Sequence, residues 1–87
     1  MTYPNNGQEI ELKYPVQNGA TELKGLRMRR PTARDLVMYQ SHSGNSEMEA
    51  EVAMFARLCD VEEETVLNLD ALDYGQLGEV YKGFFGQ

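Results

Sequence analysis

The segment RRPTARDL, residues 29–36, most constrains how this 87-residue chain can fold. Pro31 has no amide hydrogen to donate to a strand ladder, so a strand that reaches it should end there. Thr32 can cap the start of a helix, and Asp35, three residues later, can reach back to the amide of the cap residue. The segment therefore predicts the end of a strand and the start of a helix. The residues expected to form this structural junction are Arg29, Arg30, Pro31, Thr32 and Asp35.

The sequence before this junction predicts a β-hairpin. Residues 9–16 alternate between apolar and polar side chains, as in a strand with one buried face. Asn18-Gly19 then predicts a tight turn, because these residues tolerate the positive φ that such a turn needs. The return strand is expected at about residues 21–29, with a bulge near Lys24-Gly25 that brings its apolar residues into phase. The face expected to pack on the helices consists of Ile10, Leu12, Tyr14, Leu26 and Met28.

The sequence after the junction predicts three to four helices. The first is expected at about residues 33–41, with the apolar residues 36–38 available to the core. The second opens at Ser46, and Glu49 lies in the capping-box position. Residues 60–67 predict a short third helix or a single turn. The apolar stripe expected to bury the second helix consists of Met48, Val52, Phe55 and Cys59.

The last predicted helix is the most aromatic part of the chain. Asp70 is expected to cap it, with Asp73 in the reciprocal capping-box position. Its apolar repeat consists of Leu77, Tyr81 and Phe84. The helix also contains Gly75, Gly78 and Gly83, and each interior glycine costs about 1 kcal/mol of helix stability relative to alanine. Two explanations are open: neighbouring backbone packs very close to these glycines, or the helix is fully ordered only against a partner.

Together these elements predict an α+β fold in which an N-terminal β-hairpin packs on a small bundle of three to four helices. Residues 1–8 are expected to form a flexible N-terminal tail, because they combine turn residues with little apolar surface. Residues 9–87 are expected to form one domain, with the hairpin at 9–30 and the helical part at 32–86.

The net charge of −6 is unevenly distributed along the chain. Residues 1–34 carry six basic and three acidic side chains, whereas residues 35–87 carry two basic and eleven acidic ones. An acidic helical half repels phosphates, so no nucleic-acid partner is expected. The four arginines within residues 27–34 are expected to pair with the chain's own carboxylates instead.

The sequence lacks a recognisable catalytic, cofactor-binding or metal-binding motif, so we expect no enzyme, no cofactor and no metal site. His42 is the only histidine and Cys59 the only cysteine, which excludes paired-histidine and multi-cysteine sites. His42 is expected to be a solvated loop residue, and Cys59 a small core residue. No apolar run approaches the roughly 20 residues of a membrane span, so no membrane partner is expected and a cytoplasmic location is favoured. An acyl-carrier-like protein is a poor match, because residues 68–72, NLDAL, lack the serine that carries the prosthetic group.

The order and spacing of several short segments resemble a known family, the phage tail assembly chaperones of the Mu-like, contractile-tail type. The similarity covers about residues 9–85. The segments that carry it are LKYPV at 12–16, the Asn-Gly turn at 18–19, TEL at 21–23, LRMRRP at 26–31, TARDL at 32–36, FARLC at 55–59, LDALDY at 69–74 and VYKGFF at 80–85.

This resemblance implies a non-catalytic chaperone that binds the long, helical tape-measure protein and keeps it soluble during tail assembly. It also implies action in the bacterial host cytoplasm and absence from the finished virion. Self-association, or pairing with a longer form made by ribosomal frameshifting as in many relatives, is left open by the sequence. The alternative function is a small acidic protein-interaction or regulatory module of prophage origin.

The residues expected to contact a partner, as a surface for helix-in-groove binding, are Met38, Met54, Tyr81, Phe84 and Phe85. The alternative is that these side chains belong to the core, because methionine and aromatic residues at helical spacing are typical of a packed helix face. We expect the junction at residues 29–36 to fix the angle of the hairpin on the helices and the partner surface to lie elsewhere.

Overall fold

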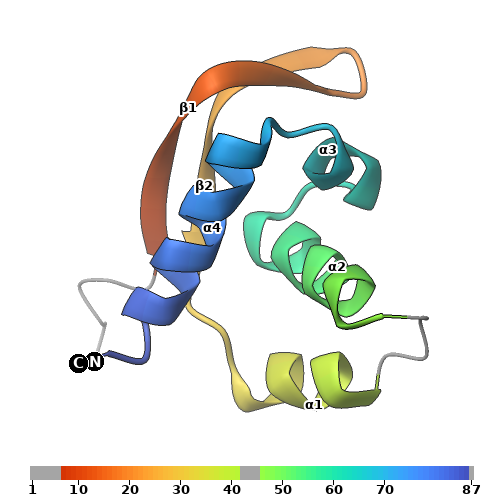
Figure 1. The fold of residues 1–87 in the computed structure, drawn as a ribbon, viewed down its shortest axis with the longest axis vertical. Helices are drawn as coiled ribbons and strands as arrows, with labels where there is room; N and C mark the ends of the chain where they lie inside the picture. Colours follow the sequence, from red (N-terminus) through yellow and green to blue (C-terminus); the bar gives the residue numbers. More distant parts are fainter. Residues whose placement is uncertain (1–6, 42–45, 87) are drawn as a thin grey trace.

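The computed structural model describes residues 7–41 and 46–86 and shows one β-hairpin followed by four helices (Figure 1). This arrangement confirms the predicted α+β fold. The expectations for His42 and for the first six residues of the tail lie outside the described residues. The elements are β1 (Gly7–Asn18), β2 (Thr21–Arg29), α1 (Ala33–Ser41), α2 (Glu47–Cys59), α3 (Glu63–Leu67) and α4 (Ala71–Gly83).

The two strands pair antiparallel, but the ladder is interrupted in the middle of β1. Glu11 lies opposite Gly25 and Val16 lies opposite Leu23, so residues 12–15 of β1 face Lys24 alone. The irregularity is therefore at the predicted place along the hairpin, although the extra residues belong to β1 and not to β2. Pro15 lies in this interrupted stretch, where no regular ladder needs an amide hydrogen from it.

The interruption also changes which side chains of β1 are buried. Ile10, Leu12 and Val16 are buried, whereas Tyr14 is 50% exposed. The prediction that Tyr14 lies on the core face is wrong, because the strict alternation of a regular strand does not hold through residues 12–15. Glycine suits position 25, since an added Cβ would lie 3.1 Å from the backbone oxygen of Ile10 and would press against it.

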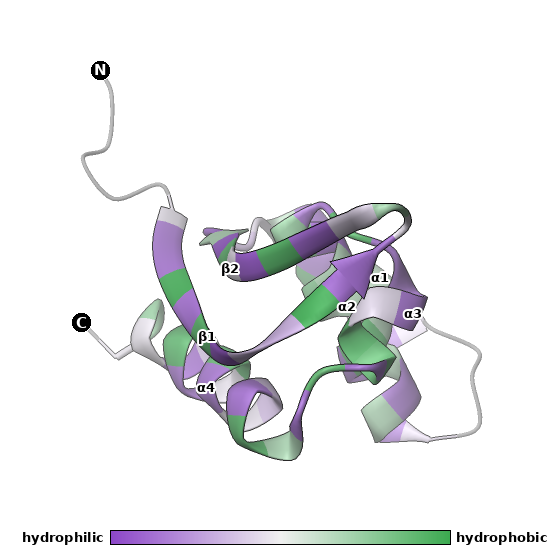
Figure 2. Cartoon of the chain, turned by 90° about the horizontal axis from the view of Figure 1, so that it is seen from above, coloured by the Kyte–Doolittle hydropathy of each residue, from purple (hydrophilic) through white to green (hydrophobic). Residues whose placement is uncertain are grey.

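The helices cover the inner face of the hairpin. α4 and α3 pack against β1, α2 packs against β2, and α1 packs against α2 at a distance from the hairpin (Figure 1). Apolar and polar bands alternate along β1 and β2 when the chain is coloured by hydropathy (Figure 2). The centre of the core consists of Phe55, Met28, Met54, Leu58, Leu77 and Val66. None of the helices in the described part of the chain is long and apolar enough to cross a membrane.

Two sets of predicted core residues are exposed in the structure. Residues 36–38 of α1 are between 38% and 61% exposed, because α1 turns Asp35 and Tyr39, four residues apart, toward the rest of the chain. Met48 is 60% exposed, although Val52, Phe55 and Cys59 of the same stripe are buried. The expectations that these four side chains join the core are therefore wrong.

The third helix is shorter than the range predicted from sequence. α2 ends at Cys59, and Asp60 follows it in the left-handed conformation, with φ of 58°. The backbone N–H of Asp60 bonds to the carbonyl groups of Ala56 and Arg57, which closes the last turn of α2. α3 therefore begins only at Glu63.

Asp73 has a role that its position in the sequence does not indicate. Asp70 caps α4, and its carboxylate accepts a hydrogen bond from the amide of Leu72. The Asp73 carboxylate instead accepts hydrogen bonds from the backbone amides of Lys13 (2.9 Å) and Tyr14 (3.0 Å) in β1. The predicted reciprocal cap is thus wrong: this buried carboxylate fastens α4 to the interrupted part of the hairpin.

We predict that Asp73→Ala lowers the free energy of unfolding by about 2–4 kcal/mol, because it leaves two strand amides without an acceptor. Asp70→Ala is the control on the same helix and should cost only about 1 kcal/mol through the lost cap. Urea denaturation measures both values. Hydrogen exchange should accelerate at the amides of Lys13 and Tyr14 in the Asp73 variant only. Equal costs for the two variants would contradict the assignment.

The glycines of α4 provide a second stability prediction. A Cβ built on Gly75 or Gly78 meets nothing within 4 Å, so close packing by neighbouring backbone does not explain them. Gly75→Ala and Gly78→Ala should each raise the free energy of unfolding by about 0.5–1 kcal/mol. Gly19→Ala is the contrasting control, because Gly19 has φ of 65° and the variant should be destabilised. Thermal denaturation of the three variants measures these effects.

Candidate functional site

The junction between β2 and α1 is built around the buried carboxylate of Asp35. Arg29 donates two hydrogen bonds to it, from Nη1 to Oδ2 at 2.7 Å and from Nη2 to Oδ1 at 3.0 Å. Arg57 of α2 donates from Nε to Oδ1 at 3.3 Å. The amide of Thr32 donates to Oδ2 at 2.7 Å, and the amide of Asp35 donates to the Thr32 hydroxyl at 3.4 Å. This reciprocal pair confirms the predicted capping box, and the arginines fasten it to β2 and α2.

The electrostatics of the junction favour the charged form of Asp35. The hydrogen bonds from Arg29 hold the pKa of this carboxyl far below its ordinary value, despite the opposing effect of burial, and the bonds from Thr32 act in the same direction as Arg29. The same contact with Asp35 raises the pKa of Arg29. Arg29 is thus the partner of an internal carboxylate, as predicted for the arginines of residues 27–34, and Arg57 of α2, outside that segment, pairs with the same carboxylate.

Arg30 connects the junction to the C-terminal end of α4. Its Nη2 donates a hydrogen bond to the backbone oxygen of Phe84 at 3.2 Å, and its guanidinium carbon lies 5.3 Å from the centre of the Phe84 ring. The junction and the predicted partner-binding residues at the end of α4 are therefore neighbours. Arg30 thus contacts a backbone oxygen and an aromatic ring, so the predicted pairing with a carboxylate is wrong for this arginine.

Aromatic rings continue from the core to the surface along α4. The Phe55 ring lies 5.7 Å from those of both Tyr74 and Tyr81, and the Tyr81 ring lies 5.0 Å from that of Phe85. The Tyr74 hydroxyl donates a hydrogen bond to Glu51 of α2. We call Tyr81, Phe84 and Phe85 the C-terminal aromatic surface.

Burial dominates the electrostatics of the two tyrosines of α4. Burial, followed by the nearby phenol of Tyr39 and the carboxylate of Glu51, raises the pKa of Tyr81. Burial and the hydrogen bond to Glu51 likewise raise the pKa of Tyr74. Tyr74 and Tyr81 are therefore neutral at physiological pH.

The five predicted partner-binding residues have different surroundings. Tyr81 and Phe84 are partly buried against the core, and Phe85 is 56% exposed, so these three lie together. Met38 is 45% exposed on α1, next to Tyr39. Met54 is 2% exposed and belongs to the core, so it is not a surface residue in this fold.

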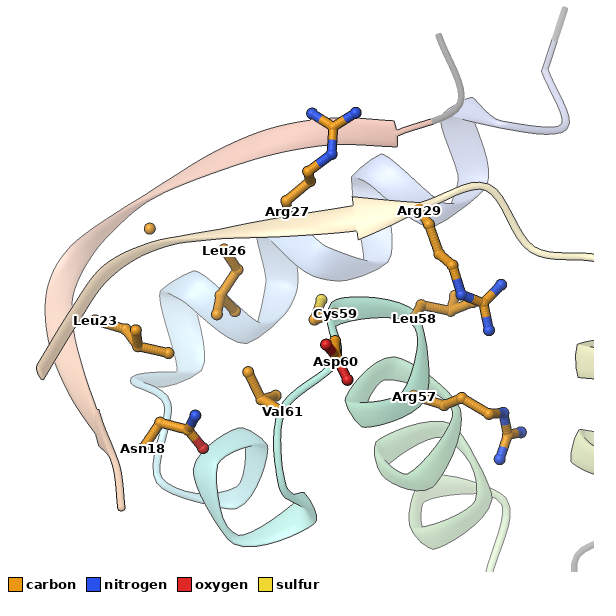
Figure 3. Close-up of a pocket in the computed structure, with 11 residues that line it drawn as sticks. Asn18, Leu23, Leu26, Arg27, Arg29, Arg57, Leu58, Cys59, Asp60 and Val61 are labelled. Atoms are coloured by element: carbon orange, nitrogen blue, oxygen red, sulfur yellow. The ribbon is translucent and has the colours of Figure 1, made fainter. Parts of the chain in front are cut away.

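A hollow of about 580 Å³ lies between β2 and the C-terminal end of α2 (Figure 3). Its wall includes Leu23, Leu26 and Val61. The guanidinium groups of Arg29 and Arg57 lie at the same end of it, where Asp35 engages both. Cys59 also lines this hollow, and burial raises the pKa of its thiol to about 12, which keeps the thiol protonated and unreactive at neutral pH.

Sequence reasoning missed two features of this region. The local pattern of Asp73 matches a helix cap, and its bond to β1 arises only when residues 60 positions apart meet. The exposure of residues 36–38 was also missed, because their apolar character is the usual signal for burial. The four-residue spacing of Asp35 and Tyr39 was the available clue that α1 turns another face inward.

We predict that Asp35→Asn lowers the free energy of unfolding at pH 7 by about 2–3 kcal/mol, because it leaves two arginines without their shared counter-charge. Glu9→Gln is the control: it removes the exposed ion pair of Glu9 with Arg27, which should cost less than about 0.5 kcal/mol. Urea denaturation at neutral pH separates the two effects.

The contribution of Asp35 should also depend on pH. Its pKa is lower in the folded than in the unfolded chain, so its stabilisation is fully present above the unfolded value of about 4 and is lost as pH falls toward the folded value. The stability difference between the wild type and Asp35→Asn should therefore shrink between about pH 5 and pH 2. A difference that stays constant over this range would show that the charge of Asp35 is not what stabilises the junction.

Comparison with known proteins identifies the family of this chain. The searches of curated proteins and of solved structures each returned no match. The family model described as phage tail assembly chaperone proteins, E, or 41 or 14, matches residues 9–86, which include the four described helices and the hairpin except for its first two residues. The chain therefore belongs to the family of phage tail assembly chaperone proteins.

Proposed function

We propose that this chaperone binds the tape-measure protein of its phage or prophage and keeps it soluble until tail-tube subunits assemble around it. The family supports a role in tail assembly, and the identity of the client is our inference. The proposed role is non-catalytic and is carried out in the bacterial cytoplasm, and the chaperone does not stay in the finished virion.

The observation that carries this proposal is the amount of apolar surface that the helical half leaves exposed. The large apolar side chains that are more than one third exposed in this half are Leu36, Val37, Met38, Met48, Leu67, Leu72 and Phe85. Single exposed apolar residues are common on soluble proteins, whereas several close together are typical of a binding surface, and three of these residues are consecutive on α1. Methionine and phenylalanine suit a helical client because they supply adaptable and large contact areas.

The charge of the chain is compatible with holding an aggregation-prone client. With a net charge of −6, complexes repel one another even while apolar surface is engaged. We infer that Phe85 and Met38 contact the client directly, since they are the most exposed of the predicted partner-binding residues. Tyr81 packs against the core and contacts the Phe85 ring, and Phe84 also packs against the core.

Gene order and co-expression test the proposed client. A major tail tube gene should lie upstream, and a very long reading frame for a helical protein downstream. Co-expression with that downstream protein should raise its soluble fraction and allow the two to co-purify. Absence of both effects would contradict the proposed function.

We predict that the double variant Met38→Ser/Phe85→Ser reduces the co-purified client by about tenfold, because each substitution removes exposed apolar contact area without opening the core. Tyr14→Ser is the matched control, since Tyr14 is 50% exposed but lies on the hairpin. Circular dichroism should show that both variants stay folded. Equal client recovery with the double variant and with the control would exclude Met38 and Phe85 from the binding surface.

A further inference from the structure

An apolar groove lies between α2 and α3 and belongs neither to the junction nor to the C-terminal aromatic surface. It has a volume of about 360 Å³ and is lined by Met48, Glu49, Val52, Glu63 and Leu67. Val52 is 6% exposed and forms the floor, whereas Met48 and Leu67 are 60% and 61% exposed and form the two walls. A volume in the lower part of the range of binding pockets, roughly 300–1,000 Å³, suits one or two bulky side chains.

The spacing of the lining residues matches the repeat of a helix. Met48 and Val52 are four residues apart on α2, and Glu63 and Leu67 are four residues apart on α3. Each pair therefore presents one turn, about 5–6 Å long, along its own helix. A helix laid in the groove presents side chains at the same interval, so its i and i+4 residues can reach both ends of the groove.

The charge around the groove selects the kind of helix that it can accept. Glu49 and Glu63 lie on its two sides, and both occupy the first turns of their helices. Residues 47–67 contain seven acidic side chains and one basic side chain, so this helical pair carries a net charge of −6. An apolar floor between acidic edges complements a helix with an apolar stripe flanked by lysine or arginine.

We propose that the α2–α3 groove docks a basic amphipathic helix of the client, with an apolar side chain seated on Val52 between Met48 and Leu67. This inference rests on the proposed function, and it names the feature of the client that is recognised. A second copy of this groove is a poor occupant because the acidic edges repel each other, and an anionic membrane surface is repelled in the same way.

The native methionines allow a direct test on the full-length chain by methyl NMR. Met48 lies in the groove, Met38 is exposed on α1, and Met28 and Met54 are buried. The probe is a designed amphipathic helix of about four turns made of leucine and lysine. Its counterpart, with glutamate in place of lysine, is the charge control. The lysine peptide should shift the Met48 methyl signal more than that of Met38, and the glutamate peptide should leave it unchanged. Equal shifts at Met38 and Met48, or a Met48 shift with the glutamate peptide, would overturn the proposal.

Variants separate apolar docking from general attraction to an acidic protein. Met48→Ser/Leu67→Ser should weaken binding of the lysine peptide at least about tenfold, whereas Tyr14→Ser should not change it. Glu49→Gln/Glu63→Gln should weaken binding about threefold or more and reduce its salt dependence, compared with the equally charged Glu11→Gln/Glu22→Gln. The same loss in both charge variants would show that binding is non-specific and would overturn the groove assignment. Unchanged Met28 and Met54 signals verify that each variant is folded.

Co-purification with the client separates this inference from the proposed function. If the wild type recovers the client and Met48→Ser/Leu67→Ser recovers about tenfold less, both proposals are supported. If this double variant recovers as much client as Tyr14→Ser does, the groove is not the docking site although the proposed function stands. If the wild type recovers no client, the proposed function fails, and the inference that rests on it fails as well.

Discussion

The fold depends on the two hydrogen bonds that the Lys13 and Tyr14 amides donate to the Asp73 carboxylate. A two-stranded hairpin is marginal in water, and this one loses its regular ladder at residues 12–15. Its amides there would be costly to bury without an acceptor. Because α4 supplies that acceptor, the hairpin and the last helix stabilise each other. The outward position of Tyr14 follows from the same irregular backbone.

Asp35 connects the remaining elements by a different kind of contact. The bidentate contact between Asp35 and Arg29 fixes the orientation of α1 relative to β2 as well as their distance. Arg57 connects α2 to the same carboxylate. α1 is therefore held mainly by Asp35 and Tyr39, and its apolar residues 36–38 are not needed for packing. Because these polar contacts hold α1 in place, its apolar residues 36–38 stay exposed on the surface. Packing of α1 through these apolar residues would have buried them.

The order of the elements and the junction could be predicted from sequence because their signals are local. The strand ends just before Pro31, and Thr32 and Asp35 cap the first helix. At the start of α2, the Ser46 hydroxyl accepts a hydrogen bond from the amide of Glu49. Asp73 shows why the rest could not be predicted. Asp73 lies three residues after Asp70, just as Asp35 lies three residues after Thr32. The Asp73 carboxylate nevertheless accepts a hydrogen bond from Lys13 of β1, 60 residues earlier in the chain.

The two methionines of α2 also show that a local sequence pattern does not determine which side chains are exposed for binding. Met48 falls on the apolar repeat and Met54 falls off it, yet Met48 is exposed and Met54 is buried. Neighbouring elements surround the C-terminal half of α2 on several sides, so burial there no longer follows one stripe. Met48, in the first turn of α2, is 60% exposed, so a predicted core residue forms the wall of an open groove.

The C-terminal aromatic surface lies at the end of a glycine-containing helix that needs stabilising contacts from other elements. Gly75, Gly78 and Gly83 have open space where a Cβ would lie, so no packing within the folded chain offsets their cost of about 1 kcal/mol each. The end of α4 therefore depends on contacts from outside the helix: Phe55 against Tyr81, and Arg30 against Phe84. Arg30 belongs to the junction that Asp35 organises. The junction thus stabilises the surface that we propose for client binding, although its own side chains are engaged inside the molecule.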